Sequence, residues 1–183
     1  VVREMADACK EYGLKLGIYL SPWDRNHPDY GKPEYITYFR NQLTELLTNY
    51  GPIFEIWFDG ANGGTGYYGG ANENRKIDRT VYYDWANTYK LIRKLQPNIV
   101  IWNDGNAWVP AEVNTSIRPE WFYHPGENER VKTVPQLMET HYHSIGRNGS
   151  LLLNFPIDTK GMIHENDERA ALAFADAVKK AFA

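Results

Sequence analysis

The sequence contains almost no cysteine and no long apolar run. Cys9 is the only cysteine in 183 residues, so an internal disulfide cannot form. No apolar stretch approaches the ~20 residues that a membrane-spanning helix needs, and we expect no membrane span. Hydrophobic residues make up 43% of the chain and charged residues 23%, which is typical of a globular protein.

Charge of one sign is also not concentrated anywhere. The formal net charge is −3 and the basic residues are scattered, which argues against a nucleic-acid partner. Cys-x-x-Cys and His-Glu-x-x-His motifs are lacking, and His141 and His143 would point to different faces of a helix. We therefore expect no metal site. A Gly-x-Ser-x-Gly elbow is lacking as well, which disfavours serine hydrolase chemistry.

Helices and short apolar strands alternate along the chain. Apolar residues at helical spacing predict helices over residues 2–12, 33–50, 82–95, 134–145 and 165–182. Short apolar runs predict buried strands over residues 16–20, 53–58, 99–102, 113–117 and 150–155. Residues 61–80 are polar and rich in glycine, and we expect a long loop there. Such alternation predicts an α/β fold with a parallel sheet covered by helices.

Two α/β folds compete, the doubly wound sheet and the (β/α)8 barrel. A glycine-rich phosphate loop follows none of the predicted strands, which disfavours a nucleotide-binding doubly wound sheet. Polar and aromatic residues gather after the strand ends, at Trp23-Asp24, Asp59, Asn103-Asp104 and Arg118. A barrel has its active site at that end of the strands, so this pattern favours the barrel.

The crossover after Trp102 is too short. Only ten residues separate Trp102 from Val113, whereas a parallel crossover takes a dozen or more and usually includes a helix. Either this pair is not an ordinary βα unit, or the chain omits a segment near residues 105–106.

Asp59 is the strongest catalytic candidate. Strand alternation places Glu55, Trp57 and Asp59 on one face, which we expect to point into a barrel, while residues 54, 56 and 58 pack against helices. A carboxylate at a strand tip, beside an indole, is well placed for a ligand. The competing interpretation is a turn-capping aspartate before a glycine. A glycosidase needs a second carboxylate, and the pattern does not decide among Asp104, Glu112 and Glu127.

Five segments, in order, resemble the alpha-L-fucosidase family of glycoside hydrolases. They are Gly17–Asn26, Glu55–Asn62, Ser116–His124, Gly146–Asn154 and Ile163–Asp167. Together they run nearly the whole length of the chain. The resemblance is closest to the branch that acts on α-1,3 and α-1,4 fucosyl linkages.

The resemblance implies a fold and a reaction. Residues 1–183 would form the C-terminal portion of a (β/α)8 catalytic barrel, a partial domain whose N-terminal strands are missing. The activity would be that of a retaining exo-α-L-fucosidase working by double displacement, with Asp59 as nucleophile. Four aromatic residues would bind the substrate: Tyr19, Trp23, Trp57 and Trp121. Neither a metal nor an organic cofactor is implied.

The resemblance also marks a departure. The family's general acid is a glutamate that should fall between Trp102 and Trp108, where no matching segment occurs and where the crossover is too short. The alternative interpretation is therefore a catalytically inactive, fucose-binding barrel of the same family. Expected partners are fucosylated oligosaccharides or glycoconjugates, and the expected location is the periplasm, the cell surface or the secreted fraction.

Overall fold

The computed structural model describes residues 1–59, 64–102 and 111–182. The chain forms two compact units, Val1–Ala107 and Trp108–Ala183, each described here by itself. The elements of the first unit are α1 (Val2–Glu11), β1 (Gly17–Tyr19), α2 (Pro33–Asn49), β2 (Glu55–Trp57), β3 (Gly66–Tyr68), β4 (Glu73–Arg75), α3 (Trp85–Leu95) and β5 (Val100–Trp102).

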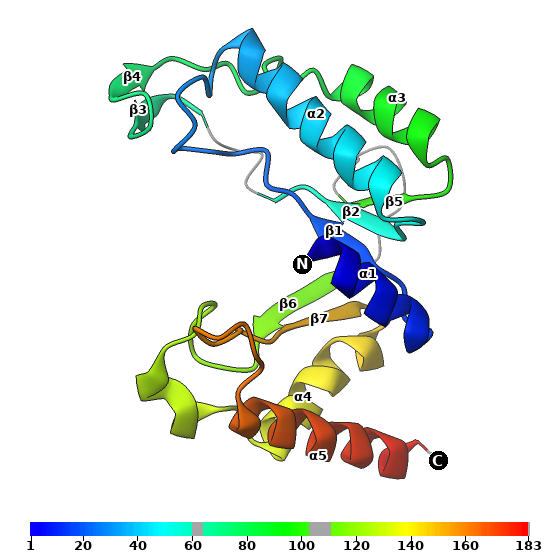
Figure 1. Ribbon diagram of the computed structural model, residues 1–183. Coiled ribbons are helices and arrows are strands. Elements are labelled where there is room, and N and C mark those ends of the chain that lie inside the picture. The colour runs from blue at the N-terminus through cyan, green and yellow to red at the C-terminus, as the bar shows by residue number, and fades with distance from the viewer. Residues whose placement is uncertain (60–63, 103–110, 183) are drawn as a thin grey trace. The chain divides into compact units, whose positions relative to one another are not determined.

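A parallel sheet in the order β1-β2-β5 organises the first unit. Gly17 pairs with Glu55 and Tyr19 with Trp57, so β1 and β2 end side by side. Helices α2 and α3 lie next to each other against this sheet (Figure 1). The buried core between them includes Phe39, Leu43, Ile56, Ile92 and Ile101.

Helix α2 shows how the sequence specifies these elements. Pro33 occupies the start of the helix, where its missing N–H costs no hydrogen bond. Phe39, Leu43 and Leu47 recur every four residues and are all buried. Each such side chain contributes about 1.5–3 kcal/mol when it leaves water. Gly51, with φ of +84°, then turns the chain toward β2 in a conformation that favours glycine.

The prediction of a loop over residues 61–80 is wrong in part. Strands β3 and β4 pair there as an antiparallel hairpin, with Tyr67 opposite Asn74. Tyr68 anchors the hairpin, because its buried ring stacks on that of Tyr30 with 4.8 Å between the centroids. Each strand has three residues, too few to show an apolar alternation in the sequence.

The second unit contains a parallel βαβ arrangement. Its elements are β6 (Glu112–Ser116), η1 (Pro125–Arg130), α4 (Val134–His143), η2 (Ile145–Arg147), β7 (Ser150–Asn154) and α5 (Glu165–Ala181). Strands β6 and β7 pair in parallel, with Ser116 opposite Asn154. Helix α4 connects the two strands and packs against α5.

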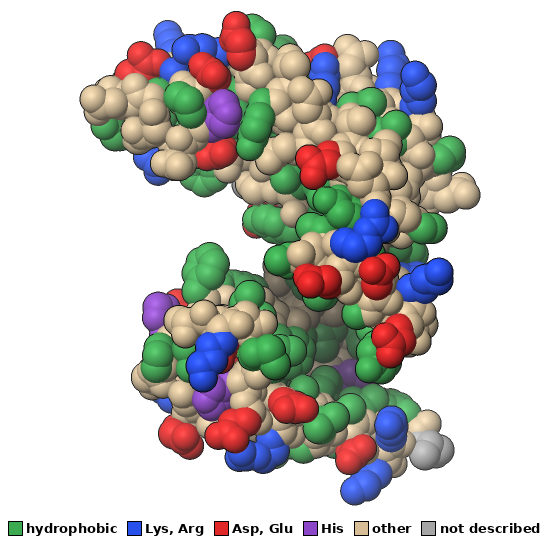
Figure 2. Space-filling view, viewed as in Figure 1, with side chains coloured by type: hydrophobic (Ala, Val, Ile, Leu, Met, Phe, Trp, Pro, Cys, Tyr) green, Lys and Arg blue, Asp and Glu red, His purple; other side chains and the backbone are tan. Residues whose placement is uncertain are grey.

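The predicted α/β class and its five core strands are confirmed, with strand ends that differ from the prediction by at most two residues. The parallel strands form one three-stranded and one two-stranded sheet among the described residues, and these do not close a barrel. The predicted break near residues 105–106 lies outside the described residues. None of the described helices is both long and apolar enough to cross a membrane. Acidic and basic side chains are interspersed on the face that Figure 2 shows.

A buried ion pair holds the second unit together. Arg118 and Asp167 are both fully buried, and the Arg118 Nε lies 2.8 Å from the Asp167 Oδ2. The Arg118 Nη1 also donates to the side chain of Asn128 at 3.0 Å and to the carbonyl of His124 at 3.3 Å. The pair therefore fastens the loop after β6 to the first turn of α5.

Removing one partner of this pair should destabilise the unit strongly. We expect Asp167→Ala to cost about 3–5 kcal/mol of unfolding free energy, because it leaves a buried, uncompensated guanidinium. Denaturant unfolding of the full-length protein measures this cost. Asp176→Ala, at an exposed position of the same helix, should stay within about 0.5 kcal/mol of wild type. Equal effects of the two substitutions would contradict the role of the pair.

Candidate active site

Asp59 is the second residue after β2, at the carboxyl end of the parallel sheet. The Tyr19 hydroxyl, at the end of the neighbouring strand β1, donates to the Asp59 Oδ2 at 3.0 Å. The Ser21 hydroxyl donates to the Asp59 backbone carbonyl at 2.8 Å. The side chain and the backbone of Asp59 are thus both bound by the segment that leaves β1.

Trp57 and Tyr19 form an aromatic pair beside this carboxylate. They are register partners, and their rings meet edge to face with 5.4 Å between the centroids. The predicted alternation of β2 is confirmed for residues 55–59. Glu55, Trp57 and Asp59 lie on the less buried face, and residues 56 and 58 are buried. Phe54, expected in the core, is instead 43% exposed, and the ammonium group of Lys15 lies over its ring.

Two titratable groups here have raised pKa values. Burial, the hydrogen bond to Asp59 and the negative charge of that carboxylate raise the pKa of Tyr19. The Tyr19 hydroxyl therefore keeps its proton and stays a donor to Asp59. Burial alone raises the pKa of Glu55, two residues before Trp57 on the same strand face.

Trp23 is tied to the same group of residues through Ser21. The Trp23 backbone N–H donates to the Ser21 hydroxyl oxygen at 3.2 Å, and that hydroxyl binds the Asp59 carbonyl. The indole of Trp23 is 41% exposed. Sequence reasoning passed over Ser21. A hydroxyl residue one position after a buried apolar run was the available signal.

Trp121 lies in the second unit, in the loop after β6. Its side chain is 49% exposed, and its carbonyl accepts a hydrogen bond from the Asn154 Nδ2 at 2.9 Å. The same amide nitrogen donates to the Ser116 Oγ at 3.1 Å, so the loop is fastened to the carboxyl ends of both β6 and β7. Trp121 therefore lies near the carboxyl ends of β6 and β7.

The candidates for a second carboxylate occupy different places. Glu112 is the first residue of β6, at the amino end of that strand. Glu127 is buried in η1, with its Oε1 3.8 Å from the Arg130 Nη1. Asp104 lies outside the described residues. The structure therefore identifies no partner carboxylate among the residues it describes.

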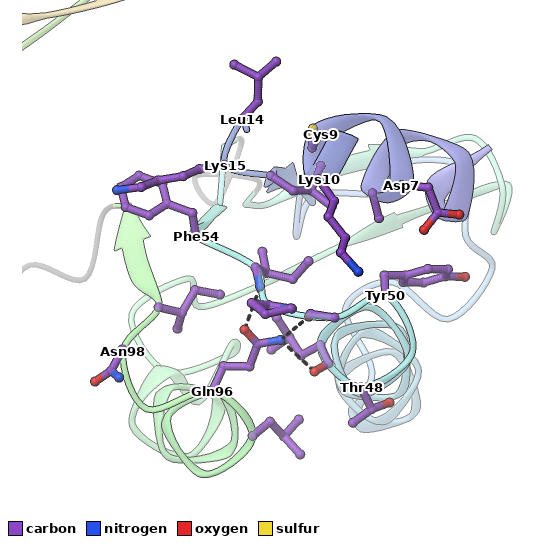
Figure 3. Close-up of a pocket in the computed structure, with 18 of the residues that line it drawn as sticks. Asp7, Cys9, Lys10, Leu14, Lys15, Thr48, Tyr50, Phe54, Gln96 and Asn98 are labelled. Atoms are coloured by element: carbon purple, nitrogen blue, oxygen red, sulfur yellow. Dashed lines mark hydrogen bonds between the residues drawn. The ribbon is translucent and has the colours of Figure 1, made fainter. Parts of the chain in front are cut away.

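A hollow of about 1130 Å³ lies at the opposite ends of the same strands (Figure 3). Gln96 lies in its wall, accepting from the Ile53 N–H at 2.8 Å and donating to the Leu47 and Gly51 carbonyls at 2.9 and 3.0 Å. Its lining comes from α1, from the carboxyl ends of α2 and α3 and from the segments that lead into β1, β2 and β5, away from Asp59. Among the described residues, no cluster of three or more His, Cys, Asp or Glu side chains is suited to a metal ion.

Comparison with known families identifies the family to which the chain belongs. The profile of the alpha-L-fucosidase family matches residues 1–180. The chain belongs to the alpha-L-fucosidase family. The resemblance read from the five sequence segments is thereby confirmed at the level of the family.

Relatives in the alpha-L-fucosidase family agree. "Alpha-L-fucosidase 1" of Arabidopsis thaliana is 36% identical over 222 residues, covering 96% of this chain and 41% of the relative. A glycoside hydrolase 29 family member from an unknown rumen bacterium is 54% identical with a TM-score of 0.89, covering 97% of this chain and 40% of that one. The chain thus spans about 40% of the length of these relatives.

A more distant structure contains a substrate. It is an alpha-L-fucosidase AlfC mutant in complex with 4-nitrophenyl-α-L-fucopyranoside, 21% identical to this chain with a TM-score of 0.75. The structural match covers 99% of this chain and 65% of the AlfC chain. At this identity the likeness concerns the fold alone.

The raised pKa of Glu55 predicts a pH-dependent effect on stability. Because the fold favours the neutral acid, its stabilising contribution is complete below the ordinary pKa and is lost as pH rises through the raised one. We expect Glu55→Gln to raise the Tm of the full-length protein at pH 7 and to leave it unchanged near pH 3. Glu139→Gln, exposed on α4, is the control and should change neither. A gain that is the same at both pH values would contradict this account.

Proposed function

We propose that this chain is part of the catalytic domain of a retaining exo-α-L-fucosidase, in which Asp59 is the nucleophile. The observation that supports this most directly is the binding of the Asp59 carboxylate by the Tyr19 hydroxyl at the carboxyl end of two paired strands. Active sites of parallel α/β enzymes lie at that end. Membership of the alpha-L-fucosidase family supplies the sugar.

The reaction proceeds in two displacements. Asp59 attacks the anomeric carbon of fucose while the bond to the leaving oxygen breaks and a general acid protonates that oxygen. Water then attacks the same carbon, the bond to Asp59 breaks, and the former acid accepts the proton from water. Tyr19 orients the Asp59 carboxylate in both steps, and its raised pKa keeps its hydroxyl protonated throughout.

Aromatic side chains bind the sugar in this proposal. Fucose presents an apolar side with a methyl group, which suits an indole face. Trp57 is held in place by the edge-to-face contact with Tyr19. Trp23, whose backbone N–H binds the Ser21 hydroxyl, flanks the fucose pocket. For Trp121, on a loop of the second unit fastened by Asn154, the sugar-binding role is the one that the resemblance of its segment implies.

The general acid, we infer, belongs to a segment that this chain lacks. The alignment with the Arabidopsis relative extends over 222 residues, more than the 183 of this chain. Within the aligned region, the relative therefore has residues that have no counterpart in this chain. The short crossover after Trp102 is a natural place for such a segment. The positions of Glu112 and Glu127 offer no substitute that the structure singles out.

The finer assignments follow from the resemblance of the five segments. The linkage class is α-1,3 or α-1,4, and the substrates are fucosylated oligosaccharides or glycoconjugates. The domain is the C-terminal portion of a (β/α)8 barrel, which the two parallel sheets support. The location is the periplasm, the cell surface or the secreted fraction.

Replacing Asp59 tests the nucleophile. On the full-length protein, we expect Asp59→Ala to lower kcat by at least about a thousandfold, on both a Lewis-type trisaccharide and an aryl α-L-fucoside. Added azide, which fits the space of the missing carboxylate, should partly restore turnover of the aryl fucoside. Asp7→Ala, at an exposed position of α1, should retain wild-type rates. A wild type that binds fucose but cleaves neither substrate would instead establish the inactive, fucose-binding barrel.

Replacing Tyr19 tests how the carboxylate is held. Tyr19→Phe removes one hydrogen bond to a charged group and keeps the ring against Trp57. Such bonds contribute about 1.5–3 kcal/mol, so kcat/KM for the aryl fucoside should fall about ten- to hundredfold. Steady-state kinetics measures the loss. An unchanged kcat/KM would mean that the bond has no part in catalysis.

A further inference from the structure

The loop that follows β1 forms a second surface, made by Trp23 and Arg25 and connected to Asp59 through Ser21. The Ser21 hydroxyl bridges the Asp59 carbonyl at 2.8 Å and the Trp23 N–H at 3.2 Å, which keeps Trp23 close to the reacting carboxylate. The guanidinium of Arg25 lies over the Trp23 ring, 5.8 Å from its centroid. Both side chains are exposed. A cation and an indole are therefore presented together on the loop that Ser21 ties to Asp59.

The β3–β4 hairpin fixes Arg25 in this place. The Arg25 Nη2 donates to the Tyr67 carbonyl at 2.7 Å, and the Gly70 N–H donates to the Arg25 carbonyl at 3.1 Å. The buried ring of Tyr68 lies 5.9 Å from the guanidinium carbon on another side. The side chain is thus ordered before any ligand arrives, which lowers the entropic cost of binding.

Gly70 allows the hairpin to approach the backbone of residues 25 and 26 closely. A Cβ added there would lie 1.7 Å from the backbone oxygen of Asn26, far inside van der Waals contact. The hairpin can close onto the loop that carries Arg25 only because residue 70 has no side chain. A larger residue would push the hairpin and the loop apart.

The chemistry of the pair suits a sugar ring. An indole face packs on the C–H side of a pyranose, and a guanidinium has five N–H donors for hydroxyl oxygens, of which the bond to Tyr67 uses one. Asp59 acts on the terminal fucose. The Trp23–Arg25 surface, on the neighbouring loop, is therefore placed to contact the group to which the fucose is linked.

We propose that Trp23 and Arg25, held by the hairpin, form the binding subsite for the sugar that leaves when fucose is cleaved. Arg25 then determines specificity by donating to oxygens of that sugar while Trp23 stacks against its ring. This inference rests on the proposed function, because it needs a fucosidase reaction at Asp59. It predicts that the enzyme prefers fucose linked to a glycan over fucose linked to a simple aryl group.

The test compares two substrates on the full-length protein, a fucosylated trisaccharide and 4-nitrophenyl α-L-fucoside. We expect Arg25→Ala to lower the ratio of kcat/KM for the trisaccharide to that for the aryl fucoside by about tenfold or more, through loss of charged hydrogen bonds. Arg25→Gln, an uncharged polar replacement, should lower the ratio too and serves as the second variant should Arg25→Ala fold poorly. Gly70→Ala should act in the same direction by displacing the hairpin. Arg79→Ala, at an exposed arginine of the same unit, should leave the ratio unchanged.

The outcomes separate the two proposals. An active wild type whose ratio falls with Arg25→Ala and Gly70→Ala, but not with Arg79→Ala, supports the subsite. An active wild type whose two kcat/KM values change in parallel, or not at all, overturns the subsite and leaves the proposed function standing. A wild type that cleaves neither substrate overturns the proposed function, and the subsite with it.

Discussion

The parallel pairing of β1 with β2 is the constraint on which the rest of the candidate site depends. Its register places Tyr19 beside Trp57, so that the hydroxyl of one strand end reaches the carboxylate after the other at 3.0 Å. A slip of one residue would turn every side chain of β1 to the other face and break that bond. Register in this sheet is held by buried residues such as Ile56, which leave only one face of β2 free for polar chemistry.

Aromatic packing also fixes the β3–β4 hairpin and the loop that follows β1. Tyr68 ties the hairpin to the buried ring of Tyr30, and the hairpin in turn holds the loop that carries Arg25. The high aromatic content of the sequence, 14%, therefore has two uses in the first unit. Buried rings build the core between sheet and helices. The half-buried Trp57 and the exposed Trp23 are left at the carboxyl ends of β2 and β1, where a sugar would be bound.

The second unit follows the same logic with a different anchor. The backbone carbonyl of its exposed Trp121 accepts a hydrogen bond from the Asn154 side-chain amide, and the loop around it is fixed by the buried pair of Arg118 and Asp167. Two ions taken out of water are tolerated here because they pair with each other and the Arg118 Nη1 gains two further acceptors, although the Arg118 Nη2 is left without a hydrogen bond among the described residues. An aromatic ring can be exposed on a loop and still be well positioned when charged groups beneath it fix the backbone.

The sequence by itself determined the α/β class, the five core strands and the position of Asp59 at a strand tip, because apolar periodicity is a local property of the chain. The five family segments added the family and the roles proposed for the aromatic residues. Only the tertiary structure showed the bond between Tyr19 and Asp59, the bridge through Ser21 and the hairpin that holds Arg25. These contacts join residues up to 42 positions apart, and strand register and loop closure decide them. Hydrophobic pattern fixes which face a residue occupies, but it does not specify which distant donor will meet a given acceptor.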